Sequence, residues 1–375
     1  MALWKLLNLV LLIGLFAAQS GVAQILYAGV NSAGGEFGQH NLPGTFGIDY
    51  RFINETTIDI FLNEGINVVR LPFLLERICP LSTGLGSTFN ETYFAELQKA
   101  VIHITKSGAY AILDAHNYMR YNDPSNQPWS GSVIGSVIGS ADPSAATTQQ
   151  LAHFWYALSE RFVSNPNVIF GLMNEPHEMP TSLVLANNQA SINAIRAAGA
   201  KQLILVPGNG FAGAHRWMEY TCWDAAKQCT ANSEVMTQIY EPGNNFAFDM
   251  HVYFDKDTGG MEAECTTASP GNLYAVTNWL KEKNYTAFLS EFGAAANEGC
   301  WATLNSTLTF MEQNSAQWIG WTYWAAGPLW GDYFLSIEPG RGVGSTTTWP
   351  LVLAPHVKSY QPMMRFSMSV ARRSS

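Results

Sequence analysis

Short apolar runs recur along the chain, and longer stretches with apolar residues at helical spacing separate them. The runs are rich in Val, Ile, Leu and Phe, which is typical of parallel strands that are buried on both faces. Eight such runs occur, at residues 25–31, 67–71, 109–116, 167–175, 202–206, 246–251, 287–291 and 318–324.

The stretches between the runs predict helices. Residues 93–107 follow this pattern, and residues 150–164 carry five large apolar side chains at helical spacing, namely Leu151, Phe154, Trp155, Leu158 and Phe162. Strands that alternate with helices predict right-handed β-α-β units around a parallel sheet. Eight repeats predict a single-domain (β/α)8 TIM barrel of the α/β class. Residues 130–146 are rich in Gly, Ser and Ala and predict a loop after the third strand.

Residues 1–23 have the pattern of a secretory signal peptide, with a lysine near the start, an apolar stretch, and small residues up to Ala23. We expect cleavage after Ala23 and a secreted, extracellular protein. The apolar stretch is short for a membrane anchor, and no other segment is long and apolar enough to cross a bilayer. Residues 24–360 would then form the barrel domain, and residues 361–375 a solvated tail.

The chain has five cysteines, and secretion makes disulfides available to them. The odd number leaves at least one thiol free or bonded to another chain. We expect Cys222 to pair with Cys229 and Cys265 to pair with Cys300, leaving Cys79 free and buried, although the sequence alone does not fix this connectivity. Four sequons are candidate glycosylation sites, at Asn54, Asn90, Asn284 and Asn305.

Composition narrows the class of protein. Of the 375 residues, 47% are apolar and 13% are charged, so the chain can bury a large core and is not disordered. The formal net charge of −9 argues against a nucleic-acid partner, which would require a basic face. Twelve Trp and fifteen Tyr either pack in the core or line a groove in which flat rings match the apolar faces of sugars. No repeat or heptad pattern indicates oligomers, and we expect a monomer.

Two of the apolar runs end in a glutamate, Glu175 in the fourth run and Glu291 in the seventh. An ionised carboxylate loses hydration at the end of a buried strand, so its presence there needs a reason. In an α/β barrel the carboxyl ends of the strands form the active-site face, and the fourth and seventh strands lie on opposite sides of its mouth. Two facing carboxyl groups are the machinery of glycoside hydrolysis, because one protonates the leaving oxygen and the other meets the developing positive charge.

Further polar and aromatic residues stand at or near the carboxyl ends of the runs, namely Arg70, His116, Asn174, His251, Tyr253 and Trp324. The arginine would hold Glu291 ionised by charge pairing, and the tyrosine would donate a hydrogen bond to the same carboxylate. The asparagine would bind a sugar 2-hydroxyl, and the two histidines would orient a hydroxyl group or the acid. The tryptophan would form the floor of the sugar subsite just before the cleaved bond.

These residues stand in a fixed order of motifs: Arg70, His116-Asn117-Tyr118, Asn174-Glu175-Pro176, His251-Val252-Tyr253, Leu289-Ser290-Glu291-Phe292-Gly293 and Tyr323-Trp324. The set resembles family 5 of the glycoside hydrolases, and within that family the secreted fungal endo-β-1,4-glucanases (cellulases). The resemblance covers nearly all of the mature chain, from Gly29 to Gly327.

The resemblance implies that Glu175 is the acid/base and Glu291 the nucleophile of a double displacement with retention. It places further residues at substrate-binding positions: Arg70, His116, Asn117, Asn174, His251, Tyr253 and Trp324. It implies a β-glucan polysaccharide or oligosaccharide as the substrate and no cofactor. The segments around Cys265 and Cys300 also resemble a disulfide pair of the fungal enzymes, which agrees with the expected pairing.

Two departures from the family pattern concern loops. Phe211 stands where many relatives carry Trp, which would weaken a distal stacking contact. The sequence Tyr121-Asn122-Asp123-Pro124 replaces a common Asn-Gly, so the loop after the third strand differs. Neither departure touches the two glutamates.

Rival functions fit the sequence less well. A zinc protease helix would need a second histidine four residues after His177, where Thr181 stands, and no Cys/His cluster has zinc spacing. A serine hydrolase would need a Gly-x-Ser-x-Gly turn after a strand. A binding-only barrel would be expected to have replaced Glu175 or Glu291. Mannanase, xyloglucanase and β-1,3-glucanase activities remain as alternatives within the family, because the carboxylates do not discriminate among these substrates.

Overall fold

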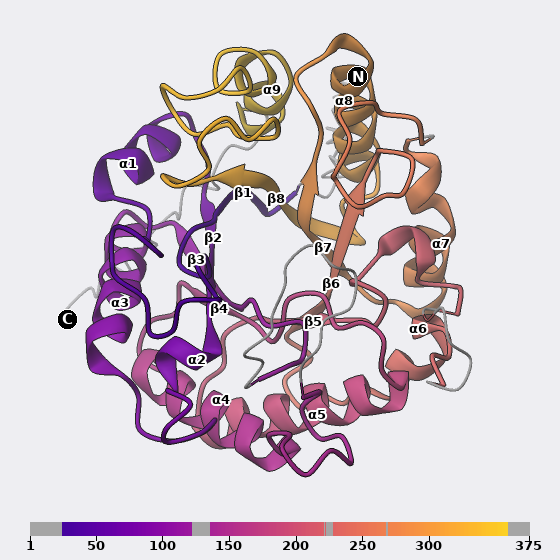
Figure 1. The fold of residues 1–375 in the computed structure, drawn as a ribbon. Helices are drawn as coiled ribbons and strands as arrows, with labels where there is room; N and C mark the ends of the chain where they lie inside the picture. Colours follow the sequence, from indigo (N-terminus) through magenta and orange to yellow (C-terminus); the bar gives the residue numbers. More distant parts are fainter. Residues whose placement is uncertain (1–24, 122–135, 221, 223–227, 268, 359–375) are drawn as a thin grey trace, which may run out of the picture.

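Eight parallel strands close into a barrel in the computed structural model, which describes residues 25–121, 136–220, 222, 228–267 and 269–358 (Figure 1). The strands are β1 (Tyr27–Ser32), β2 (Val68–Phe73), β3 (Tyr110–Ala115), β4 (Val168–Gly171), β5 (Ile204–Pro207), β6 (Phe246–Tyr253), β7 (Ala287–Gly293) and β8 (Trp318–Ala326). Each strand pairs with the next, and β1 pairs with β8 to close the barrel. The predicted (β/α)8 barrel is confirmed.

Helices surround the barrel on its outer side (Figure 1). The α-helices in the described ranges are α1 (Glu55–Asn63), α2 (Leu75–Ile78), α3 (Glu91–Lys106), α4 (Thr148–Phe162), α5 (Thr181–Ala197), α6 (Asn232–Val235), α7 (Gly271–Lys283), α8 (Glu298–Gln313) and α9 (Ala354–Lys358). Short 3₁₀ helices are η1 (Ala214–Arg216) and η3 (Met236–Gln238), and η4 (Trp349–Leu353) is a π-helix that leads into α9.

The two helices predicted from apolar spacing, α3 and α4, both begin two residues earlier than expected. Asn90 caps α3 by accepting hydrogen bonds from the backbone N–H groups of Thr92 and Tyr93. Thr147 and Gln150 form a capping box at the start of α4. A cap fixes the first turn through backbone hydrogen bonds, so the apolar periodicity starts only after it.

The barrel interior changes from apolar to polar along its axis. Buried apolar side chains fill the end nearer the strand amino termini: Val68, Ile112, Ile169, Leu205, Ala247 and Phe288. Two residues further along four of these strands stand buried polar side chains, namely Arg70, Asp114, Asp249 and Ser290. Because side chains on one face of a strand recur every second residue, these polar groups form the next layer toward the carboxyl ends. The strands thus carry an apolar layer below and a polar layer above.

The strand ends differ from the prediction that each glutamate closes a strand. β4 ends at Gly171, four residues before Glu175, and β7 continues beyond Glu291 to Gly293. Leu172 and Met173 are buried outside the strand, so the apolar pattern continues where the strand has already stopped. Burial and strand pairing therefore end at different residues.

Both expected cysteine pairs lie at bonding distance. The Cα atoms of Cys222 and Cys229 are 5.2 Å apart, and those of Cys265 and Cys300 are 5.3 Å apart, within the usual range for disulfides. Cys79 is a buried free thiol. The predicted signal peptide at 1–23, the tail at 361–375 and residues 122–135 of the loop after β3 lie outside the described residues.

The four sequon asparagines occupy helix ends or a helix surface. Asn54 and Asn90 are the N-caps of α1 and α3, and Asn284 is the left-handed C-cap of α7. Asn305 is exposed on α8. Glycosylation at these positions remains a prediction.

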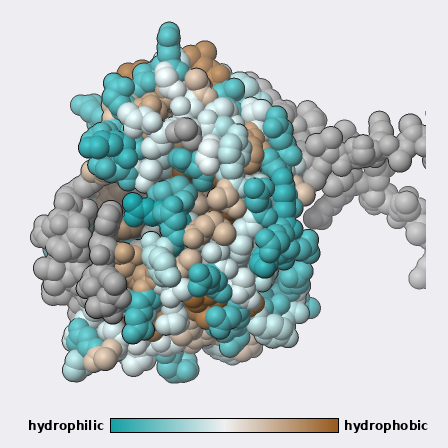
Figure 2. All heavy atoms as spheres, turned by 90° about the vertical axis from the view of Figure 1, so that its right-hand side faces the viewer, coloured by the Kyte–Doolittle hydropathy of each residue, from teal (hydrophilic) through white to brown (hydrophobic). Residues whose placement is uncertain are grey.

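The surface on the side of α7 is mainly hydrophilic, and its hydrophobic residues form small separate groups (Figure 2). None of the helices in the described ranges has the length and apolar character that a membrane span requires.

We predict that Thr147→Ala lowers the free energy of unfolding by about 1 kcal/mol, because it removes the hydroxyl that accepts from the backbone N–H of Gln150. Thr309→Ala, within α8, is the matched control and should leave stability nearly unchanged. Denaturant unfolding of both variants measures the difference, and equal stabilities would contradict a stabilising role for the capping box.

Candidate active site

Arg70 lies in the polar layer of the barrel with its guanidinium fully buried. Its Nη1 donates to Oε1 of Glu291 at 2.6 Å and to Oδ1 of Asn31 at 2.8 Å. Its Nη2 donates to Oδ1 of Asn174 at 2.8 Å and lies 3.0 Å from Oδ1 of Asp114. One positive charge therefore joins side chains from β1, β3, β7 and the segment after β4.

Glu291 is a buried carboxylate with a donor at each oxygen. Arg70 reaches Oε1, and the Tyr253 hydroxyl donates to Oε2 at 3.1 Å. Nδ1 of His251 lies 3.5 Å from the same Oε2. Burial alone would raise the pKa of Glu291, but the charges of His251 and Arg70 outweigh burial and hold the pKa below its ordinary value. This carboxyl group is therefore kept ionised.

Glu175 belongs to the same cluster but has a different environment. Its backbone is left-handed, with φ of 43°, and its Oε1 lies 2.7 Å from Nδ1 of His251. The other ring nitrogen of His251, Nε2, lies 2.9 Å from Oγ of Ser290. Burial raises the pKa of Glu175; the contact with His251 opposes this rise, and the charge of Glu291 adds to it. The net pKa is above the ordinary value, which suits a group that must carry a proton.

The two carboxyl groups lie close together. Oxygen atoms of Glu175 and Glu291 and a ring nitrogen of His251 all lie within 4.8 Å of one another. The carboxyl groups of retaining glycosidases stand about 5–5.5 Å apart, whereas inverting enzymes leave about 6.5–9.5 Å so that a water molecule fits between them. The short separation favours direct attack by one carboxylate.

The same three side chains have the spacing of metal ligands within the described ranges. Each of them already has a partner, however. The imidazole of His251 lies against Glu175, and Glu291 accepts hydrogen bonds from Arg70 and Tyr253. Arg70 supplies the positive charge that a metal would otherwise bring, so the arrangement fits proton transfer and we assign no metal to it.

Trp324 contributes a flat surface from β8. Its indole stacks on the imidazole of His116, with ring centroids 5.5 Å apart and planes at 12°. Nδ1 of His116 lies 2.7 Å from Oδ2 of Asp114. Burial alone would lower the pKa of His116, but Asp114 and the neighbouring carboxylates raise it above the ordinary value.

Asn117 occupies a different position from the other predicted site residues. Its Oδ1 accepts a hydrogen bond from the backbone N–H of Leu75 at 2.8 Å, and its Nδ2 donates to Glu76 at 2.7 Å. Both polar atoms of its amide are thus engaged at the start of α2. The geometry gives Asn117 a contact with α2 rather than with the carboxylate pair.

Three supporting residues were missed by sequence reasoning, namely Asn31, Asp114 and Ser290. Asn31 and Asp114 contact Arg70, and Ser290 contacts His251. Asp114 and Ser290 each stand two residues beyond an apolar inward position, so the strand period itself could have revealed them. Asn31 closes the first apolar run, so its place at a strand end could have revealed it as well.

The position that departs from the family pattern, Phe211, lies beside the segment that carries Glu175, because its N–H donates to the Pro176 carbonyl at 3.0 Å. Its ring stacks on His177 with centroids 4.1 Å apart and planes at 11°. Phe211 is 40% exposed. A phenyl ring offers a smaller flat surface than an indole. One face of the Phe211 ring is covered by the imidazole of His177.

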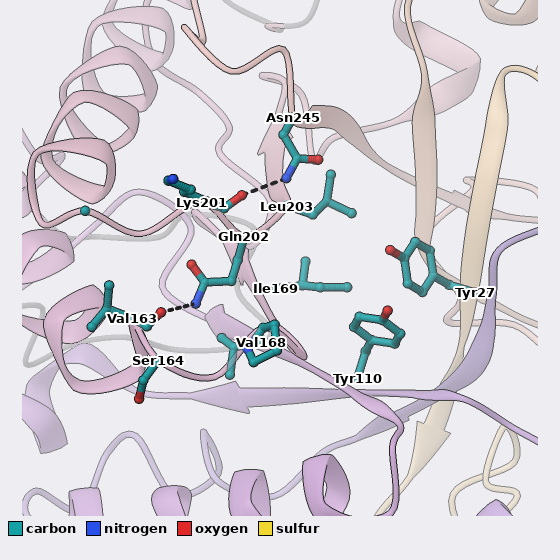
Figure 3. Close-up of a pocket in the computed structure, with 12 residues that line it drawn as sticks. Tyr27, Tyr110, Val163, Ser164, Val168, Ile169, Lys201, Gln202, Leu203 and Asn245 are labelled. Carbon is teal, nitrogen blue, oxygen red and sulfur yellow. Dashed lines mark hydrogen bonds between the residues drawn. The ribbon is translucent and has the colours of Figure 1, made fainter. Parts of the chain in front are cut away.

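A cavity of about 600 Å³ lies at the opposite end of the barrel, near the amino ends of β1, β3, β4 and β5 (Figure 3). The rings of Tyr27 and Tyr110 meet edge to face there, with centroids 5.0 Å apart. The cavity contains neither of the two glutamates. Because barrel chemistry takes place at the carboxyl ends of the strands, we do not assign the active site to this cavity.

The sequence is similar to known glycoside hydrolases, as the geometry of the site suggests. The family described as "Cellulase (glycosyl hydrolase family 5)" matches residues 30–327. The chain is 50% identical to Endoglucanase 1 of Robillarda sp. (strain Y-20), over 91% of both chains.

Solved structures show the same likeness. An endo-β-1,4-glucanase of Xanthomonas axonopodis pv. citri, carrying three substitutions, superposes with a TM-score of 0.78 at 34% identity and covers 89% of this chain and 99% of its own. XacCel5A in complex with cellopentaose gives a TM-score of 0.75 at 37% identity, covering 84% of this chain and 94% of that one. With a family match across the barrel and a relative of this identity, the chain belongs to the cellulases of glycosyl hydrolase family 5.

Proposed function

We propose that this protein is a secreted, retaining endo-β-1,4-glucanase that cleaves internal bonds of cellulose and related β-glucans by double displacement. The observation that carries the proposal is the pair Glu175 and Glu291, whose oxygen atoms lie within 4.8 Å and whose pKa values are shifted in opposite directions. The Robillarda relative is an endoglucanase, and the XacCel5A structure contains cellopentaose, which supports a β-1,4-glucan as the substrate.

In the first step, the carboxylate of Glu291 attacks the anomeric carbon while Glu175 donates its proton to the leaving glycosidic oxygen. Arg70 and Tyr253 hold the attacking carboxylate by its two oxygens, which fixes its direction. The glucosidic bond breaks, and a covalent bond from the sugar to Glu291 forms.

In the second step, Glu175 is a carboxylate and takes a proton from water as the water attacks the anomeric carbon, which frees Glu291. In its charged form His251 donates from Nδ1 to the Glu175 carboxylate, which stabilises the state that takes the proton from water. Its other nitrogen, Nε2, donates to the Ser290 hydroxyl, which holds the ring in place.

The remaining site residues suit sugar binding. Oδ1 of Asn174 accepts from Arg70, which leaves its amide nitrogen to donate to a sugar 2-hydroxyl. The stacked pair of Trp324 and His116 offers a flat surface for the sugar ring before the cleaved bond.

Secretion follows from the signal-peptide pattern of residues 1–23, and glycosylation from the four sequons. We further propose a monomer that binds neither nucleic acid nor a membrane, which agrees with the acidic net charge and with the small hydrophobic groups on the face in Figure 2.

The substrate can be tested directly. Incubation with carboxymethylcellulose, β-mannan and laminarin should give fastest release from carboxymethylcellulose, with mixed oligosaccharides and an early fall in viscosity because internal bonds are cut. Reducing-end assays measure the rate of release, and chromatography of the products measures their sizes. Faster release from mannan or laminarin would assign the enzyme to one of the alternative β-glycanase activities instead.

Retention makes a stereochemical prediction. The short carboxylate separation is in the range of retaining rather than inverting enzymes, so the first product should have the β configuration at its new reducing end. Proton NMR during the first minutes of cellopentaose hydrolysis detects this before mutarotation. An α product formed first would establish inversion and exclude a covalent intermediate on Glu291.

The two glutamates should respond differently to substitution. Glu291→Gln should lower kcat by about 10⁴-fold or more while cellopentaose still binds, because the nucleophile is lost. Glu175→Gln should spare the first step on an aryl cellobioside whose leaving group needs no protonation. Stopped-flow kinetics and calorimetric binding measure these effects.

Glu64→Gln, at the exposed C-cap of α1, is the control and should keep full activity. Normal turnover by Glu291→Gln would overturn the assignment of the nucleophile.

A further inference from the structure

Tyr253 is supported on its ring face by a turn that follows β6, spanning residues 255–262. Asp255, at its start, is 3% exposed. Its Oδ1 accepts from the backbone N–H of Gly260 at 2.9 Å, and its Oδ2 accepts from those of Met261 and Glu262 at 2.9 and 3.2 Å. One buried carboxylate therefore closes the whole turn through three backbone donors.

The turn places the Gly260 backbone directly on the Tyr253 ring. A Cβ atom at Gly260 would lie 2.5 Å from Cδ1 and 2.7 Å from Cε1 of the phenol, closer than any side chain tolerates. Gly260 also has a φ of 70°, which favours glycine. The ring has no room to tilt toward the turn.

The segment after the turn is anchored at several points. The carbonyl of Phe254 accepts from the backbone N–H groups of Thr266 and Thr267 at 2.8 and 3.1 Å. Cys265 in the same segment pairs with Cys300 on α8. The turn that packs on the Tyr253 ring is therefore held in place by backbone hydrogen bonds and a disulfide.

We propose that Asp255 is a positioning residue for the reaction: it folds residues 255–262 so that Gly260 holds the Tyr253 hydroxyl on Oε2 of Glu291. The inference rests on the proposed role of Glu291 as the nucleophile. Loss of the Asp255 contacts would let the phenol move away from its 3.1 Å hydrogen bond and leave one oxygen of Glu291 without its donor.

The effect has a direction on the pH scale. Glu291 faces the charged groups His251, Arg70 and His116. The Tyr253 phenol faces the carboxylates of Glu291 and Glu175 and the neutral phenol of Tyr333. A hydrogen bond to an ionised carboxylate favours that form, so loss of the phenol donor raises the pKa of Glu291. The acidic limb of kcat/KM then moves to higher pH, because a higher pH is needed to ionise Glu291.

The test compares Asp255→Asn, Gly260→Ala and Tyr253→Phe in the full-length enzyme. Tyr253→Phe should lower kcat/KM on carboxymethylcellulose by about 10-fold or more, as expected for a lost hydrogen bond to a charged group. Asp255→Asn and Gly260→Ala should lower it less, and all three should shift the acidic limb upward. The double variant Asp255→Asn with Tyr253→Phe should behave like Tyr253→Phe alone, because both changes remove the same contact.

Asp142→Asn is the matched control, since Asp142 caps an exposed turn through the backbone N–H of Ser144. An unshifted acidic limb in Asp255→Asn, or losses that multiply in the double variant, would overturn the proposal. Should Asp255→Asn not fold, Gly260→Ala decides, because it keeps the carboxylate while its Cβ displaces the Tyr253 ring. Failure of the proposed function is separate: it would show as turnover by Glu291→Gln.

Discussion

The buried guanidinium of Arg70 is the constraint on which the rest of the site depends. A cation without solvent contact is costly unless charged and polar partners surround it, and here Glu291, Asp114, Asn31 and Asn174 do so. These partners come from β1, β3, β7 and the segment after β4, so each must place its side chain at the same level along the barrel axis. Removal of the arginine would leave the buried carboxylates of Glu291 and Asp114 without the permanent cation that they share, which destabilises the fold and weakens the chemistry at once.

The same burial produces two carboxyl groups with opposite proton affinities. Desolvation raises the pKa of both Glu175 and Glu291, but only Glu291 lies against the permanent charge of Arg70. The partner of Glu175 is His251, whose charge depends on its own proton, and whose pKa is raised by the surrounding carboxylates although burial opposes this. A fixed cation beside one group and a titratable partner beside the other separate a carboxyl group that stays ionised from one that carries a proton, as the proposed nucleophile and acid/base require.

Periodicity predicted the barrel because eight strands with buried faces leave a strong apolar signal. Glu175 and Glu291 were predicted because a charge after such a run is anomalous. The residues at which the strands end were not predicted, because β4 stops at Gly171 while burial continues through Met173. The role of Asn117 at α2 and the turn closed by Asp255 depend on backbone N–H groups brought together by folding. The type of a residue indicates whether it is buried and whether it is charged. Which group it hydrogen-bonds depends on how the chain folds, and the sequence alone does not give this.

The layered interior lets the same strands carry both the apolar side chains that stabilise the barrel and the polar side chains of the site, at separate positions. Val68 and Arg70 stand two residues apart on β2, as do Phe288 and Ser290 on β7, so one strand period separates apolar packing from the polar network. Substitutions in the lower layer act on packing, and those in the upper layer act on charge. Phe211, which we expect to meet a distal sugar, lies instead on a loop, where its exposed ring stacks on His177 rather than packing in either layer. Selectivity among β-glycans can therefore vary while the pair Glu175 and Glu291 stays fixed.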